Sequence, residues 1–143
     1  MSSPAPNSPA PDTSAQRALI LVVERNPMVQ RLERFFLEKA GFSVEFTEDG
    51  LTALARAREL KPRIVVTEIL VPKLDGLSLC SRIKSSAETK HILVMIFSHL
   101  QAEDRAREAG ADAFLAKPLE EELLIETLEK LLALQKHSAG EGN

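Results

Sequence analysis

The chain has 143 residues, of which 44% are hydrophobic and 27% are charged, and its formal net charge is −3. A chain of this length and composition buries one hydrophobic core, and its slightly acidic balance gives no electrostatic reason to expect nucleic acid as a partner. Its longest apolar runs, at 18–23 and 92–97, are far shorter than the ~20 residues needed to cross a bilayer, so no membrane segment is predicted.

Both ends of the chain are predicted to lie outside the folded domain. Residues 1–17 are rich in Pro, Ser and Ala and lack the basic and apolar segments of a targeting sequence, which predicts a disordered tail. At the other end Gly140 and Gly142 stand among polar residues, so 135–143 is predicted to be a flexible tail. The expected domain is therefore 18–134.

Within 18–134, short apolar runs alternate with segments of helical periodicity. This alternation is typical of α/β domains built on a parallel sheet. In chain order the sequence predicts strand 18–23, helix 27–40, strand 43–46, helix 51–60, strand 64–67, a helix from Gly76 to about residue 84, strand 92–97, helix 102–109, strand 113–116 and helix 119–134.

Residues at the boundaries of these elements support the assignment. Asn26 precedes Pro27, which predicts an N-cap followed by the proline favoured at the first helical position. Gly41 and Gly110 follow two helices as C-terminal caps, and Asp75 is expected to cap and turn the chain into the third helix.

Five β/α units in this order predict a doubly wound, five-stranded parallel sheet with helices on both faces. Ligands of such sheets bind beyond the carboxyl ends of the strands. Those ends hold a carboxylate pair, a guanidinium, a hydroxyl and an ammonium, from Glu24, Arg25, Glu68, Ser98 and Lys117. These residues are the candidate site.

Cys80 is the single cysteine and lies in the apolar run 77–83. One cysteine forms neither an intrachain disulfide nor a cysteine-based metal site, and its setting predicts a buried, inert thiol. This usage favours a reducing, cytoplasmic location.

Four stretches in the right order and spacing resemble the response-regulator receiver domain of two-component signalling: LILVVERNPMV, IVVTEILVPKLDGL, ILVMIFS and AGADAFLAKPL. The resemblance implies the flavodoxin-like strand order 2-1-3-4-5 and a cis Lys117–Pro118 peptide bond. It also implies a role for each site position. Glu24 and position 25 would be the acidic metal-binding pair, Glu68 the phosphoacceptor, Ser98 the switch hydroxyl, Phe114 the switch aromatic and Lys117 the phosphate-contacting lysine.

Two positions depart from the family pattern. A receiver uses an Asp nucleophile and a Mg²⁺ ion held by oxygen ligands, but this chain has Glu68 and Arg25. The extra methylene of Glu68 displaces the carboxylate by roughly 1.5 Å, and an error of ~1 Å in a reacting group can cost a hundredfold in rate. Arg25 has donors and no acceptor, so it disfavours Mg²⁺. If a metal bound at all, Glu24 and Glu68 would hold it.

The same departures suggest a metal-free arrangement. We expect Arg25 to occupy the place of the ion and to bridge Glu24 and Glu68, while Lys117 holds the other side of Glu68. Glu68 would then partly imitate an acyl phosphate, drawing Ser98 inward and biasing Phe114 toward its buried rotamer. The module would be locked in one signalling state.

Three functional classes follow. The first is a stand-alone atypical receiver, not an enzyme, that binds protein partners such as a histidine kinase or a downstream signalling protein without ordinary aspartyl phosphorylation. The alternative is a functional or phosphomimetic single-domain response regulator of a histidine-kinase phosphorelay. A hydrolase on a similar scaffold is the third, but the chain lacks an Asp nucleophile at a strand end.

The last helix suggests a protein interface. Its expected core stripe is widened by Ile125 and Leu132, beyond the usual apolar arc. This flank predicts a possible homodimer through the last helix, and the alternative is that a neighbouring element covers it. The residues expected in the core stripe are Leu123, Leu124, Thr127, Leu128 and Leu131.

Overall fold

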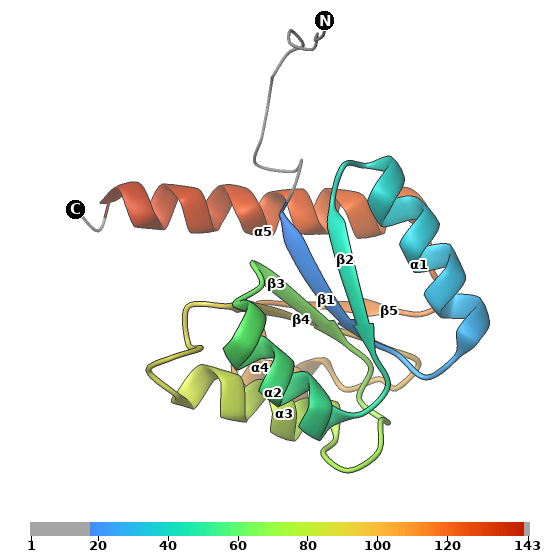
Figure 1. Ribbon diagram of the computed structural model, residues 1–143, viewed down its shortest axis with the longest axis horizontal. Helices are drawn as coiled ribbons and strands as arrows, with labels where there is room; N and C mark the ends of the chain where they lie inside the picture. Colours follow the sequence, from blue (N-terminus) through green and yellow to red (C-terminus); the bar gives the residue numbers. More distant parts are fainter. Residues whose placement is uncertain (1–17, 142–143) are drawn as a thin grey trace, which may run out of the picture.

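The computed structural model describes residues 18–141, with side chains through residue 135. The tail predicted at 1–17 lies outside the described residues. Within 18–141, five strands alternate with five helices in the predicted order (Figure 1). They are β1 (Leu19–Val23), α1 (Pro27–Lys39), β2 (Ser43–Thr47), α2 (Gly50–Leu60), β3 (Ile64–Thr67), α3 (Gly76–Ser85), β4 (Leu93–Ser98), α4 (Glu103–Glu108), β5 (Ala113–Ala116) and α5 (Glu121–Glu141).

The strands form one parallel sheet in the order β2-β1-β3-β4-β5, which confirms the predicted doubly wound topology. Helices α1 and α5 cover one face of the sheet, and α2, α3 and α4 cover the other (Figure 1). Successive residues of the central strand β1 therefore enter different cores. Leu21 and Val23 pack toward α2 and α3, whereas Ile20 and Val22 pack toward α1 and α5. This two-sided burial explains the unbroken apolar run in the sequence.

The helix caps predicted at the N-terminal ends of α1 and α3 are present in the structure. The Asn26 side chain accepts hydrogen bonds from the backbone N–H groups of Met28 and Val29, and Asp75 accepts one from the Ser78 N–H. Gly41 ends the α1 turn with a φ of 99°, a conformation that glycine adopts without strain.

Two glycines bring the loop after β3 close to its neighbours. A Cβ atom on Gly76 would lie 2.2 Å from the Glu68 carbonyl oxygen, and one on Gly50 would lie 1.8 Å from the Leu74 carbonyl oxygen. Neither approach leaves room for a side chain. The start of α3 therefore packs directly on the backbone that carries Glu68, which fixes the end of β3.

The predicted end of the last helix at residue 134 is wrong, because α5 continues to Glu141. The residues after Leu134 include good helix formers such as Gln, Lys and Ala and no proline, so the backbone hydrogen-bond pattern continues. A glycine inside a helix costs only about 1 kcal/mol, which does not stop it. No described helix combines the length and apolar composition that crossing a bilayer demands.

The predicted apolar arc of α5 is rotated in the structure. Leu132 is only 2% exposed and Ile125 packs against the same core, whereas Leu123, expected in the core stripe, is 43% exposed. The neighbouring core covers the flank on which the predicted homodimer depended. Ile125 and Leu132 therefore give no support to an interface.

Candidate functional site

Polar side chains gather where the parallel strands end. Glu24 follows β1, Glu68 follows β3, Ser98 is the last residue of β4 and Lys117 follows β5. Because the strands are parallel, their carboxyl ends meet at one edge of the sheet. The structure therefore brings together four of the residues that the sequence selected.

Lys117 lies between the two carboxylates. Its Nζ is 2.7 Å from Glu24 Oε1 and 3.1 Å from Glu68 Oε1, and it lies 5.4 Å from the centre of the Phe97 ring. The side chains of Glu24 and Lys117 are each 5% exposed, and that of Glu68 is 11% exposed. The three residues form a nearly buried ion triad.

The second carboxylate oxygen of Glu68 is also occupied. Glu68 Oε2 accepts a hydrogen bond from the Ser98 hydroxyl and further bonds from the backbone N–H groups of Ile69 at 2.7 Å and Leu70 at 3.3 Å. Ser98 Oγ in turn accepts the Leu100 N–H at 3.2 Å. Glu68 thus holds the loops after β3 and β4 together.

Glu24 connects the triad to the start of α1. Its Oε2 accepts the Asn26 backbone N–H at 3.0 Å, and its carbonyl oxygen accepts a hydrogen bond from the Gln30 side-chain amide. The N-cap residue is therefore itself held by the buried carboxylate. The Lys117–Pro118 peptide bond is cis, as the resemblance implied.

Glu68 and Lys117 are both charged at neutral pH. Burial acts to raise the pKa of Glu68, but hydrogen bonds from Ser98 and Lys117 outweigh it, so the pKa lies below its ordinary value. Burial acts to lower the pKa of Lys117, but its bonds to Glu24 and Glu68 outweigh it, so the pKa lies above its ordinary value. Lys117 therefore stays protonated beside an ionised Glu68.

The predicted bridge from Arg25 is wrong. Arg25 is exposed, and among residues 18–135 no carboxylate lies within ion-pair distance of its guanidinium. Lys117 already satisfies both carboxylates from inside the pocket. A second cation would have to give up its own hydration to reach carboxylates whose oxygens already have partners.

Glu33 is a member of this neighbourhood that the sequence reasoning missed. It is 1% exposed on α1, and its Oε1 accepts no hydrogen bond from any described residue. Burial, followed by the nearby charge of Glu24, raises its pKa from an ordinary 4.5 to about 8, while Lys117 acts in the opposite direction. The sequence does indicate that Glu33 is buried, because it falls four residues after Val29 and four before Leu37, on the apolar face of the helix.

An open hollow of about 420 Å³ lies above the triad, lined by residues that include Arg25, Leu70 and His99. A neighbouring hollow of about 620 Å³ lies between the loop after β4 and strand β5. Phe114 is half-buried, lines this second hollow and packs against the core under α3 and α4. Its ring has no group that donates or accepts a conventional hydrogen bond, so a switch role could act only through packing, and that role stays a prediction.

The residues present do not fit a magnesium ion. Mg²⁺ requires oxygen ligands in near-octahedral geometry, but Lys117 occupies one oxygen of each carboxylate, and Arg25 stands where a third acid would be needed. Within the described part of the chain, no group of three His, Cys, Asp or Glu residues is arranged to hold a metal ion. The site is therefore organised around an ammonium group.

Known proteins resemble the chain over most of its length. The sequence model of the response regulator receiver domain matches residues 20–129. The polar-differentiation response regulator DivK of Brucella anthropi is 32% identical over 116 residues, which cover 79% of this chain and 94% of DivK.

A longer protein and a solved receiver-domain structure also resemble the chain. The DNA-binding dual master transcriptional regulator RpaA of Synechocystis is 31% identical over 116 residues, and the chain spans about half of it, 48%. The crystal structure of the signal receiver domain of a signal transduction histidine kinase from Syntrophus aciditrophicus matches with a TM-score of 0.76 and 28% identity, covering 81% of this chain and 90% of that one.

Proposed function

The chain belongs to the response regulator receiver domain family, and we propose that this member signals by binding other proteins without aspartyl phosphorylation. The family places it in two-component signal transduction, where receiver domains interact with histidine kinases and other signalling proteins. The proposal concerns how this member works. Its main support is the ion triad that joins Glu24, Lys117 and Glu68.

Phosphoryl transfer needs a free nucleophile and cations that neutralise the charge on the transferring oxygens. Here both oxygens of Glu68 are engaged, by Lys117 on one side and by Ser98 and two backbone N–H groups on the other. The groups that would stabilise a phosphoryl group are already bound to the residue that would receive it. Transfer would first require these contacts to open.

The cost of opening is large enough to decide the outcome. Breaking a buried ion pair costs about 3–5 kcal/mol, and about 1.4 kcal/mol corresponds to a tenfold change in rate. Opening the triad alone would slow transfer by roughly two to four orders of magnitude. The displaced carboxylate of Glu68 and the lack of a metal-binding acid at position 25 act in the same direction.

A second candidate function is favoured by the bond between Ser98 and Glu68. In this alternative Glu68 imitates the phosphorylated acceptor, so the chain is a phosphomimetic regulator held in an active-like state. The longer Glu side chain reaches the switch hydroxyl, as a phosphoryl oxygen would. The two candidates differ in what happens when Glu68 is shortened, because a phosphomimetic loses its signal and a constitutive binding module does not.

Beryllium fluoride with Mg²⁺, a stable analogue of a phosphoryl group, tests the main proposal. We expect no change in the amide NMR spectrum of the parent chain at the strand ends. The matched control is the double variant Arg25→Asp, Glu68→Asp, in which we expect the amides near residues 24, 68 and 98 to shift. Saturable shifts of these amides in the parent chain would contradict the proposal.

A further inference from the structure

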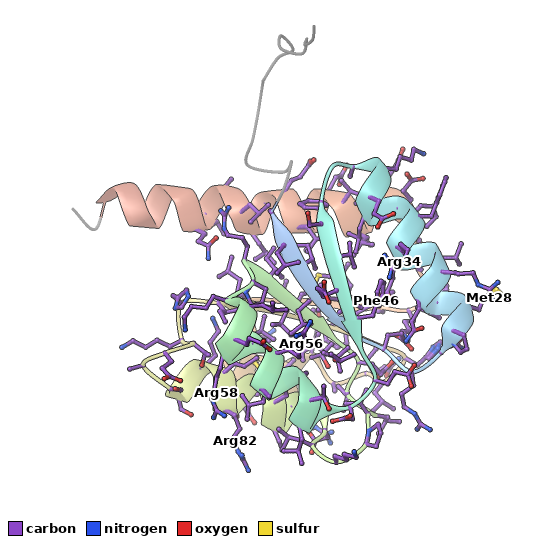
Figure 2. All side chains as sticks on the ribbon, viewed as in Figure 1. Met28, Arg34, Phe46, Arg56, Arg58 and Arg82 are labelled. Carbon is purple, nitrogen blue, oxygen red and sulfur yellow. The ribbon has the colours of Figure 1, made fainter. Side chains whose placement is uncertain are left out.

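Helix α1 exposes a stripe of large apolar side chains. Met28 is 62% exposed, Leu32 42% and Phe35 61%. Their spacing of four and three residues places them on one side of the helix, and Figure 2 shows Met28 projecting away from the domain at the N-terminal end of α1. Large apolar side chains grouped on the surface of a soluble domain mark a contact site. We call these three residues the α1 stripe.

The stripe lies in a basic setting, which limits the kind of partner it fits. One exposed acid, Glu38, stands against four exposed basic residues at the start of and along α1: Arg25, Arg31, Arg34 and Lys39. Lys39 also lies 5.7 Å from the centre of the Phe35 ring, so charge and apolar surface are interleaved. A complementary surface must combine apolar side chains with carboxylates.

The outward side of α5 has this complementary chemistry. Leu123 is 43% exposed and stands beside the exposed Glu122 and three residues before the exposed Glu126, whereas Leu134, four residues after Lys130, is 62% exposed. Within residues 121–135, one exposed basic residue, Lys130, stands against the exposed Glu122, Glu126 and Glu129. We call this the acidic face of α5. It differs from the flank of Ile125 and Leu132, which the core covers.

We propose that the chain pairs with a second copy of itself, with the α1 stripe of each copy lying against the acidic face of α5 of the other. The two helices cover the same face of the sheet (Figure 1), and the ion pair between Lys39 and Glu121, 3.0 Å apart, already joins them within one copy. A two-fold axis running between α1 and α5 in the plane of the interface brings each α1 onto the opposite α5, and the contact is made twice.

Charge excludes the other two-fold arrangement of the same faces. An axis turned by 90° would place α1 on α1 and α5 on α5, which would set basic side chains against basic ones and acidic against acidic. Like-charge juxtaposition across an interface is costly and suppresses wrong pairings. The crossed arrangement is therefore the one that the charges select.

The surface formed by α1 and α5 together is large enough for a weak, reversible dimer. Helix α1 has 13 residues and is about 20 Å long and about 10 Å wide, and α5 over 121–135 is similar. The footprint is roughly 400 Å² per copy, or about 800 Å² in total, which lies in the range of weak, transient interfaces.

Sedimentation over a concentration series tests the pairing. We expect the parent chain to dimerise reversibly, and more tightly at low than at high salt, because the charged contacts are screened by ions. Phe35→Ser should weaken dimerisation at least about tenfold, since the lost contact is made twice. The matched control is Leu51→Ser, which removes a 49% exposed leucine from α2 on the opposite side of the sheet and should leave the dissociation constant unchanged.

Charge reversal identifies the arrangement. An acidic copy carries Arg31→Glu and Lys39→Glu, and a basic copy carries Glu122→Lys and Glu126→Lys. All four positions are exposed, so each variant should fold. We expect each copy alone to be monomeric, because its α1 and α5 now have the same sign, and an equimolar mixture to form heterodimers.

Three results would overturn the proposal. The first is a parent chain that stays monomeric throughout the concentration series, since the exposed stripe would then serve a different protein. The second is an equal loss of dimer in the Leu51→Ser control. The third is a basic copy that dimerises as tightly as the parent, because the acids of α5 would then make no contact with the α1 of the other copy.

Discussion

Replacing Glu33 with Gln is predicted to stabilise the protein at neutral pH. The carboxyl is 1% exposed, its Oε1 has no hydrogen-bond partner among the described residues, and its pKa is raised to about 8. The folded domain must therefore keep this group protonated or accept a buried charge beside Glu24. An amide has the same shape and no proton to lose.

The sign and size of the predicted stabilisation follow from the raised pKa of Glu33. Between pH 4.5 and 8 the folded state binds more protons at Glu33 than the unfolded state does, so the free energy of unfolding falls as the pH rises. The contribution of Glu33 is complete below pH 4.5 and is lost as the pH rises through about 8. At about 1.4 kcal/mol per pH unit, the loss is about 3 kcal/mol at pH 7 and at most about 5 kcal/mol above pH 8.

Urea unfolding followed by circular dichroism at pH 5.5, 7.0 and 8.5 measures the effect. We expect the gap between Glu33→Gln and the parent to widen in favour of the variant by about 3 kcal/mol across these values, as the linkage relation requires. Glu33→Met should behave in the same way, because it also removes the proton. The control is Glu38→Gln, an exposed carboxyl on the same helix, which should leave the slope unchanged. If the parent and Glu33→Gln curves run parallel with pH, the reasoning is refuted.

Three further predictions concern the residues around the site. Lys117→Met leaves Glu24 and Glu68 buried without a cation, so it should lower the free energy of unfolding by about 3–5 kcal/mol at pH 7. The loss should be smaller at pH 5, where the carboxylates can take up protons. Urea titrations at both pH values measure the two losses, and equal losses would count against the triad. Gly76→Ala places a Cβ 2.2 Å from the Glu68 carbonyl oxygen, so it should destabilise by more than ~3 kcal/mol in thermal unfolding; a change below 1 kcal/mol would mean that the loop shifts freely. Arg25→Ala should change stability by less than ~0.5 kcal/mol, because the side chain is exposed and unpaired within the described residues; a larger loss in the same assay would reinstate the bridge expected from the sequence.

The fold could be predicted because its signals are local and agree with one another. The apolar run of β1, the cap at Asn26 and the turn at Gly41 each specify one boundary, and β/α alternation leaves few topologies. The end of α5 could not be placed, because Gly140 and Gly142 suggested a tail while the residues before them favour helix. The gain from helix propensity and the cost of ordering the chain end are nearly equal there, so the sequence alone does not show where the helix stops.

The candidate site was predicted as a set of residues but not as a set of contacts. Parallel strand ends must converge, so Glu24, Glu68, Ser98 and Lys117 were found together. Which cation would lie between the carboxylates depended on side-chain direction. Arg25 is one residue beyond Glu24 and turns to solvent, whereas Lys117 reaches the pocket from β5. Sequence spacing gives the neighbourhood of a side chain, and packing decides where it points.

Intact mass after incubation with acetyl phosphate and Mg²⁺ tests the central claim most directly. The parent chain is measured beside the double variant Arg25→Asp, Glu68→Asp, which restores the two acids of the family pattern. We predict that the parent gains no phosphoryl group while the double variant gains one. A parent chain that is phosphorylated would contradict the account, and peptide mapping would then show which residue accepts the group in spite of the triad.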